Sequence, residues 1–134
     1  MRSMIVLCVL GLAVTCGFAG EADTSVCKPF IERNETCKVD LLKTCTSALK
    51  VKMLEQIEAS PEEFRAEMRE GLDGKVQGFC NGFFSQVTGD RALGVCTEAM
   101  GGSDPDSLGK VQEMKVCLAK ETCTAYAECA VRFD

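Results

Sequence analysis

Cysteine is the residue type in this chain with the greatest potential for chemistry, and histidine is absent. Ten cysteines occur in 134 residues, and eight of them follow residue 26. No two of these eight are separated by only two residues, as zinc ribbons and thioredoxin-like redox sites require. An even number of cysteines in an exported chain is typical of a disulfide framework. We therefore expect structural disulfides at Cys27, Cys37, Cys45, Cys80, Cys96, Cys117, Cys123 and Cys129.

Helix geometry restricts how these cysteines can pair. The residues Cys27, Cys37 and Cys45 share one helical pattern. Two cysteines six or more residues apart on a helix are separated by about 9 Å or more, whereas a disulfide needs Cα atoms about 4.4–6.8 Å apart. The three are therefore expected to pair outside their own helix, although a helix break near Asn34 would allow Cys27 to pair with Cys37. The remaining connectivities stay open.

The missing histidine also limits the catalytic mechanisms that are open to this chain. Ser-His-Asp and Cys-His arrangements, the common zinc sites and the imidazole general base are all excluded. Four glutamates between residues 62 and 70 lie beside Arg65 and Arg69, where ion pairs along a solvated helix explain them better than catalysis. We expect no enzymatic activity, no catalytic residues, no cofactor and no metal site.

The N-terminal segment has the three parts of a secretion signal. Arg2 precedes an apolar run from Met4 to Val14, and small residues follow up to Ala19. The apolar run is shorter than the roughly 20 residues that span a bilayer. We predict a signal peptide over residues 1–19, cleaved after Ala19, and a single cysteine-rich domain over residues 20–134. The protein is expected to be secreted and extracellular, without stable membrane insertion.

Asn34 begins the single N-glycosylation sequon, Asn34-Glu35-Thr36. Export would make its use possible if the asparagine is exposed. The sequence therefore indicates a glycoprotein with Asn34 as the candidate site, whose use stays open, and a glycan there would fix that side of the first helix as exposed.

The charge balance is acidic, with 15 Lys and Arg against 20 Asp and Glu and a net charge of −5. A nucleic-acid backbone calls for clustered cations, and the cations here are scattered among acids. We expect no nucleic-acid binding. The candidate partners are an extracellular protein or a small hydrophobic ligand.

Apolar residues recur at three- and four-residue steps along most of the chain, and the alternation typical of strands is nearly absent. The sequence thus predicts an all-α fold, a small disulfide-rich bundle of about four to six helices. Ser60-Pro61-Glu62-Glu63 has the pattern of a helix start, with serine as N-cap, and Gly71 with Asp73-Gly74 should end that helix. Asp104 is expected to cap another helix, because the residues after it lack the acidic positions of a calcium loop.

Phenylalanines are concentrated between residues 75 and 87, which we expect to form the core helix. Phe79, Phe83 and Phe84 lie within one arc of that helix. Phe64 and Met68 on the preceding helix are likewise expected to face inward. The three phenylalanines are also a possible apolar ligand face, although ordinary core packing is the simpler interpretation.

Three functions are compatible with a small, exported, cross-linked scaffold that lacks catalytic residue types. The favoured one is a non-enzymatic protein acting by surface recognition, as an extracellular signal, a toxin-like effector or a defence factor. The second is a carrier that holds a small hydrophobic ligand between helices. The third is a component of an extracellular matrix or coat. An enclosed cavity would favour the carrier, and a solid core would favour surface recognition.

Overall fold

The computed structural model describes residues 23–133, and every regular element within them is an α-helix. The predicted all-α, disulfide-rich fold is confirmed, with seven helices in the described residues. The signal peptide predicted for residues 1–19 lies outside the described residues. The helices are α2 (Cys27–Thr36), α3 (Lys38–Ala59), α4 (Glu62–Arg69), α5 (Leu72–Gln86), α6 (Ala92–Met100), α7 (Pro105–Leu118) and α8 (Cys123–Ala130).

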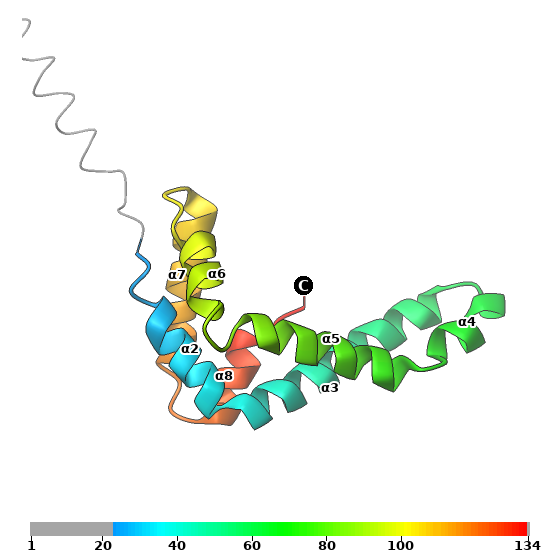
Figure 1. Cartoon of the computed structure of the whole chain (residues 1–134). Helices are drawn as coiled ribbons and strands as arrows, with labels where there is room; N and C mark the ends of the chain where they lie inside the picture. Colours follow the sequence, from blue (N-terminus) through cyan, green and yellow to red (C-terminus); the bar gives the residue numbers. More distant parts are fainter. Residues whose placement is uncertain (1–22, 134) are drawn as a thin grey trace, which may run out of the picture.

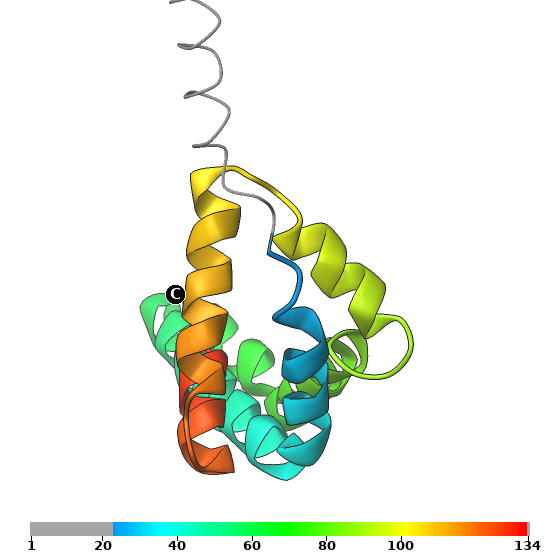
Figure 2. The same ribbon diagram turned by 90° about the vertical axis from the view of Figure 1, so that its left-hand side faces the viewer.

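Two parts of the molecule extend in different directions from a common junction (Figure 1). On one side α2, α6, α7 and α8 gather together, and α2 contacts both α6 and α7 (Figure 2). On the other side α3 and α5 run side by side, with the short helix α4 at their free end. We call α3, α4 and α5 the arm. Because α8 packs against α3, it ties the arm to the rest of the molecule.

The buried residues form three small clusters instead of one central core. The first lies between α2, α6 and α7, the second where α3, α7 and α8 meet, and the third within the arm. A helix with few neighbours buries only a narrow stripe of its surface. The clusters comprise Val26, Cys27, Cys96, Met100 and Val111; Cys37, Leu41, Cys117, Tyr126 and Ala127; and Ile57, Leu72 and Val76.

The helix boundaries follow local backbone signals. The first long pattern breaks at Cys37, three residues beyond the break considered near Asn34, and this separates α2 from α3. Gly71 has a φ of 66° and Gly89 a φ of 72°, the left-handed region that glycine enters without steric cost. These two glycines separate α4 from α5 and α5 from α6. Gly71 therefore lies at the helix end as predicted, whereas the expected contribution of Asp73 and Gly74 is wrong, because both belong to α5.

Side-chain caps agree with the sequence at one predicted position and differ at another. Asp104 caps α7, where its Oδ1 accepts a hydrogen bond of 3.0 Å from the Ser107 backbone N–H. The capping predicted for Ser60 is wrong, because α4 begins at Glu62 and has no side-chain cap. Ser60 instead ends α3, where its hydroxyl donates to the Gln56 carbonyl oxygen at 2.9 Å. Pro61 lies between Ser60 and Glu62 and separates α3 from α4.

Candidate functional site

All eight cysteines predicted to form disulfides do so, and every bond links different helical segments. One bond joins α2 to α6, a second joins the α2–α3 junction to α8, a third joins α3 to α5, and the fourth joins α7 to α8. Together the four bonds link every described helix except α4 to at least one other helix. The pairs are Cys27–Cys96, Cys37–Cys123, Cys45–Cys80 and Cys117–Cys129.

The pairing follows the restriction imposed by helix geometry. Cys27, Cys37 and Cys45 all pair outside their own helices, as expected. The alternative of a Cys27–Cys37 bond is not realised although the helix does break, because the break falls at Cys37 itself and the nine residues between the two cysteines are helical. Cys37 then faces α8, where Cys123 is the first residue.

Asn34 lies in the interior and not on the exposed side of the first helix that the sequon suggested. Its side chain is 1% exposed. The Nδ2 atom donates to the Val87 carbonyl oxygen at 3.0 Å, and the Oδ1 atom accepts from the Tyr126 hydroxyl at 2.6 Å. The exposure on which use of the sequon depends is therefore not found in the fold. N-linked glycans are attached through the Nδ2 atom of asparagine. In the folded domain, the Nδ2 atom of Asn34 is already engaged inside the packing between α2, α5 and α8.

Tyr126 forms the centre of this interior contact. Burial raises the pKa of its hydroxyl, and the positive charge of Arg33 lowers that pKa in part. The Arg33 guanidinium carbon lies 5.6 Å from the centre of the tyrosine ring. Arg33 Nη2 also donates to the carbonyl oxygens of Lys120 and Glu121, at 2.9 and 3.1 Å, and thereby fixes the turn before α8. These contacts hold helices in place, and the Arg33 Nε atom is buried there without a hydrogen-bond partner.

The possible apolar ligand face of α5 is divided in the structure. Phe84 is partly buried and packs against the cluster around Tyr126. Phe79 and Phe83 are 53% and 49% exposed, so the prediction that they fill the core is wrong. The buried stripe of α5 is formed by Leu72, Val76 and Cys80. Only α3 covers α5 along most of its length, and the two phenylalanines lie beside that contact.

A small apolar cavity lies where α2, α3, α5 and the end of α8 meet. Its volume is about 40 Å³. Phe83 and Val131 contribute to its wall, and the side chain of Asn34 on the same wall is already hydrogen-bonded. Such a volume holds a few atoms at most, whereas pockets for drug-sized ligands measure roughly 300–1,000 Å³. This cavity is therefore a packing defect on the scale of a solvent molecule.

The helix α4 projects from the end of the arm and buries none of its residues. Phe64 and Met68 are 50% and 39% exposed, so their predicted inward orientation is wrong. They are four residues apart and lie on one side of the helix. No second helix covers α4 within the described residues, because its contacts are with α3.

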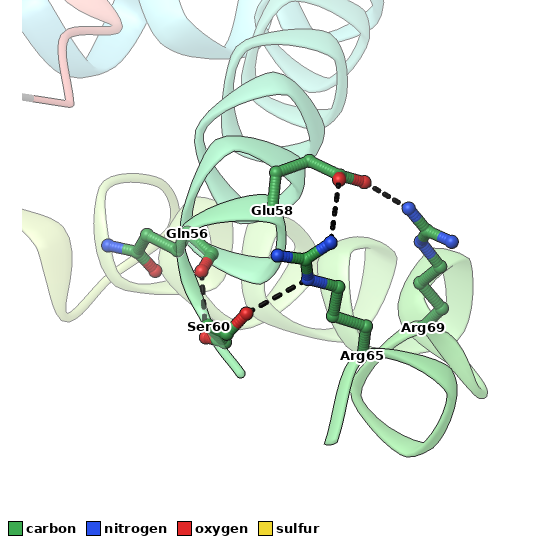
Figure 3. A network of polar contacts seen from close by, with 5 residues as sticks. All are labelled: Gln56, Glu58, Ser60, Arg65 and Arg69. Atoms are coloured by element: carbon green, nitrogen blue, oxygen red, sulfur yellow. Dashed lines mark hydrogen bonds and ion pairs between the residues drawn. The ribbon is translucent and has the colours of Figure 1, made fainter. Parts of the chain in front are cut away.

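A polar network holds α4 in place despite its lack of buried residues (Figure 3). The Glu58 carboxylate of α3 pairs with both Arg65 and Arg69 of α4. The Arg65 Nε atom also donates to the Ser60 carbonyl oxygen at 2.9 Å. The partners predicted for these arginines were the glutamates of residues 62–70, whereas both arginines pair with Glu58 of the preceding helix. The network orients α4 by polar contacts while its apolar side chains stay on the surface.

Other charged groups serve the ends of helices. Hydrogen bonds from Lys115 and Ser25 lower the pKa of Asp23 to about 2. Hydrogen bonds from Ser107 lower the pKa of the capping residue Asp104.

Among residues 23–133, no group of three or more potential metal ligands comes together. In the same part of the chain, no helix combines the length and hydrophobicity that crossing a bilayer would need.

Comparison with known proteins leaves the structure itself as the basis for assigning a function. No protein-family model matches this chain, and neither the search of curated proteins nor the search of solved structures found a match.

Proposed function

We propose that this protein is a secreted, non-enzymatic, disulfide-stabilised helical protein that acts by surface recognition. An extracellular signal, a toxin-like effector or a defence factor would each use such a molecule. The observation that supports the proposal best is α4: a helix that buries nothing, is held by a polar network, and presents Phe64 and Met68 to solvent. Exposed apolar side chains that lie together and are rimmed by polar residues are typical of protein-interaction sites.

The charges around α4 narrow the kind of partner. Residues 62–70 contain four glutamates and two arginines, and both arginines are engaged by Glu58. Within residues 23–133 none of these four glutamates forms an ion pair, and they share this short segment with Phe64 and Met68. A partner with an apolar groove and basic residues at its edge would complement this surface in the helix-in-groove manner. We therefore propose an extracellular protein with a basic-rimmed apolar groove as the partner.

The carrier and matrix alternatives have less support. A carrier of a hydrophobic ligand needs an enclosed space, and the cavity beside Phe83 measures about 40 Å³. No geometric feature of residues 23–133 favours a matrix or coat component. The export and extracellular location on which the proposal rests are supported by four intramolecular disulfides, which persist in oxidising compartments.

The test is binding of the purified, oxidised protein to cells or tissue of its source. We expect saturable binding of labelled protein, loss of that binding on reduction, and at least a roughly tenfold weaker affinity for the Phe64→Ser/Met68→Ser variant. The matched control is Leu93→Ser/Val116→Ser, which removes two apolar side chains of similar exposure from α6 and α7. Circular dichroism should show that both variants stay folded.

The proposal has two ways to fail in this experiment. The wild-type protein could show no saturable binding at any concentration, which would contradict surface recognition. Alternatively, the α4 variant could bind as tightly as the control, which would remove α4 as the recognition element. Raising the ionic strength should weaken the binding, because the proposed partner surface is basic.

A further inference from the structure

Asn34 carries the acceptor atom of the single N-glycosylation sequon in the chain, and the fold uses the same atom for packing. Its Nδ2 atom donates to the Val87 carbonyl oxygen at 3.0 Å, and its Oδ1 atom accepts from the Tyr126 hydroxyl at 2.6 Å. Asn34 is 1% exposed and Tyr126 is 0% exposed. A buried polar group that loses its partner is costly, so these two bonds hold the Asn34 side chain in one orientation.

The surroundings of Asn34 leave no room for a sugar. Its side chain lies on the wall of the small apolar cavity between α2, α3, α5 and α8, which has a volume of about 40 Å³. That space admits a few water-sized groups at most, and a single sugar with its substituents is far larger. The walls are held together, because Cys45 and Cys80 line the same cavity and join α3 to α5. A glycan at the Nδ2 atom is therefore incompatible with the native packing.

During synthesis, by contrast, the Asn34 side chain has no partner. Val87 and Tyr126 follow Asn34 by 53 and 92 residues, so neither has been made when the sequon leaves the ribosome. Chains grow at about 5–20 residues per second, so Tyr126 is made roughly 5–20 s after Asn34. Cys37 lacks its partner for nearly as long, because Cys123 follows it by 86 residues. Asn34 is thus open to modification first and closed by folding later.

We infer that Asn34 is a site at which N-glycosylation and folding exclude each other: an unmodified chain closes α2 against α5 and α8, and a chain modified at Asn34 does not. The transfer forms a bond between the Asn34 Nδ2 atom and the first sugar carbon of a lipid-linked oligosaccharide diphosphate. The bond from that carbon to the diphosphate oxygen breaks, the lipid diphosphate leaves, and the Nδ2 atom loses one proton.

The two fates of the chain differ in their disulfides. The folded protein is expected to carry an unmodified Asn34 and all four bonds. A chain glycosylated at Asn34 is expected to lack the Cys37–Cys123 bond. That bond joins the end of α2 to the start of α8, so it needs the same approach of the two helices that the glycan blocks.

The first experiment compares the oxidised protein with the reduced, unfolded chain as acceptors in vitro. Each is incubated with an oligosaccharyltransferase and a lipid-linked oligosaccharide donor, and mass spectrometry measures the modified fraction. Modification of the oxidised protein should be at least about tenfold slower, because the Nδ2 atom of Asn34 is reached only when the native packing opens. Equal rates for the two acceptors would overturn the inference, because Asn34 would then be accessible in the folded protein.

The second experiment tests whether the modified chain can fold. The reduced chain glycosylated at Asn34 is reoxidised in a glutathione buffer, and peptide mapping identifies its disulfides. The yield of chains with all four native bonds should be at least about tenfold lower than from the unmodified chain. Tyr126, the single tyrosine, should ionise at its ordinary pKa in the glycosylated chain, because its hydroxyl stays in water. A glycosylated chain that recovers the four bonds and a buried tyrosine would contradict the inference.

The matched control is Thr36→Ala/Lys120→Asn, which moves the sequon to an exposed turn. Thr36→Ala removes the acceptor motif but keeps Asn34, and the Thr36 hydroxyl only donates within α2, to the Glu32 carbonyl oxygen. Lys120→Asn gives residues 120–122 the same Asn-Glu-Thr order at an exposed position before α8. Glycosylated while reduced, this chain should recover the four native bonds. Failure of the control to refold would also overturn the inference, because the bulk of the glycan and not its position would then block folding.

This inference is independent of the proposed function. The Phe64→Ser/Met68→Ser variant keeps Asn34 and its contacts, so its modification and reoxidation should match those of the wild type. Because the transferase and the donor are supplied in vitro, the outcome does not depend on the export that the proposed function requires. Loss of target binding would thus concern α4, and refolding of the glycosylated chain would concern Asn34.

Discussion

The side chains of Asn34 and Tyr126 join α2 to α8, and the Asn34 side chain also joins them to the backbone at the end of α5. Both are almost completely buried, and the hydroxyl of Tyr126 donates to the Asn34 amide oxygen. A buried polar group that loses its partner costs about 1–3 kcal/mol, so the two residues depend on each other. The sequon at Asn34 could not show whether the side chain is exposed, because a three-residue motif contains no information on which helices will cover it.

The ionisation of Tyr126 should be shifted strongly, and it can be measured without interference because the chain has one tyrosine. Burial raises its pKa in the folded state above the ordinary value of 10.0. The contribution of Tyr126 to stability is therefore fully present below about pH 10 and is lost as the pH rises further, because the unfolded state releases the proton first. Ultraviolet titration of the native protein should show no tyrosinate near pH 10–11, where the reduced, unfolded protein ionises normally. A native titration at the ordinary pKa would mean that the hydroxyl is open to water.

Among the helices, α5 shows most clearly how neighbours decide which residues are buried. Its sequence has apolar residues over a wide arc, which suits a helix covered from two sides. Within the arm it is covered mainly by α3, and only the stripe of Leu72, Val76 and Cys80 is buried. Phe79 and Phe83 are left beside the contact, although they are larger and more apolar than some residues inside it.

Truncation of two residues on α5 should therefore reverse the order expected from their size. Val76→Ala should lower the free energy of unfolding by about 2 kcal/mol, because Val76 is completely buried against α3. Phe79→Ala should cost less than about 1 kcal/mol, because the ring is half exposed and its aromatic neighbour, Phe133, lies in the C-terminal tail. Urea unfolding with the disulfides intact measures both. A cost of about 3–5 kcal/mol for Phe79→Ala would contradict this prediction, because it would show that the Phe79 ring is buried in the core.

At the scale of the whole molecule, disulfides supply stability that a larger hydrophobic core would otherwise supply. The clusters of buried residues are small and separate. Cys27–Cys96 lies within the first cluster, Cys37–Cys123 and Cys117–Cys129 lie at the second, and Cys45–Cys80 joins the two helices that form the third. The arm depends most on such a bond, because the buried cluster within the arm comprises only Ile57, Leu72 and Val76. The open outline in Figure 1 is therefore compatible with a stable chain.

Removal of the bond within the arm should loosen the arm alone. Cys45→Ala/Cys80→Ala should cost about 2–4 kcal/mol of stability and raise amide hydrogen exchange in α3, α4 and α5. The helices α2, α6 and α7 should keep their protection, since Cys27–Cys96 still joins them. Cys117→Ala/Cys129→Ala is the control, because it should raise exchange in α7 and α8 instead. Equal exchange throughout the molecule in both variants would show that the arm is not a separate unit.

The sequence by itself determined the helices and the participation of the cysteines. Periodicity, the cap at Asp104 and the glycine at position 71 act within a few residues of the chain, so they can be predicted without knowledge of the fold. Cysteine participation follows from an even count and from the wide spacing of cysteines on single helices.

Only the tertiary structure decided which sides of those helices are buried and which cysteines are partners. Both depend on residues 12 to 86 positions away in the chain, as the separations of the four disulfides show. An apolar residue is buried only if another element reaches it. Phe64 and Phe79 lie where the arm has a single neighbour, and Asn34 lies where three helices meet. The number of neighbours around a helix is a property of the assembled fold, and it cannot be read from that helix alone.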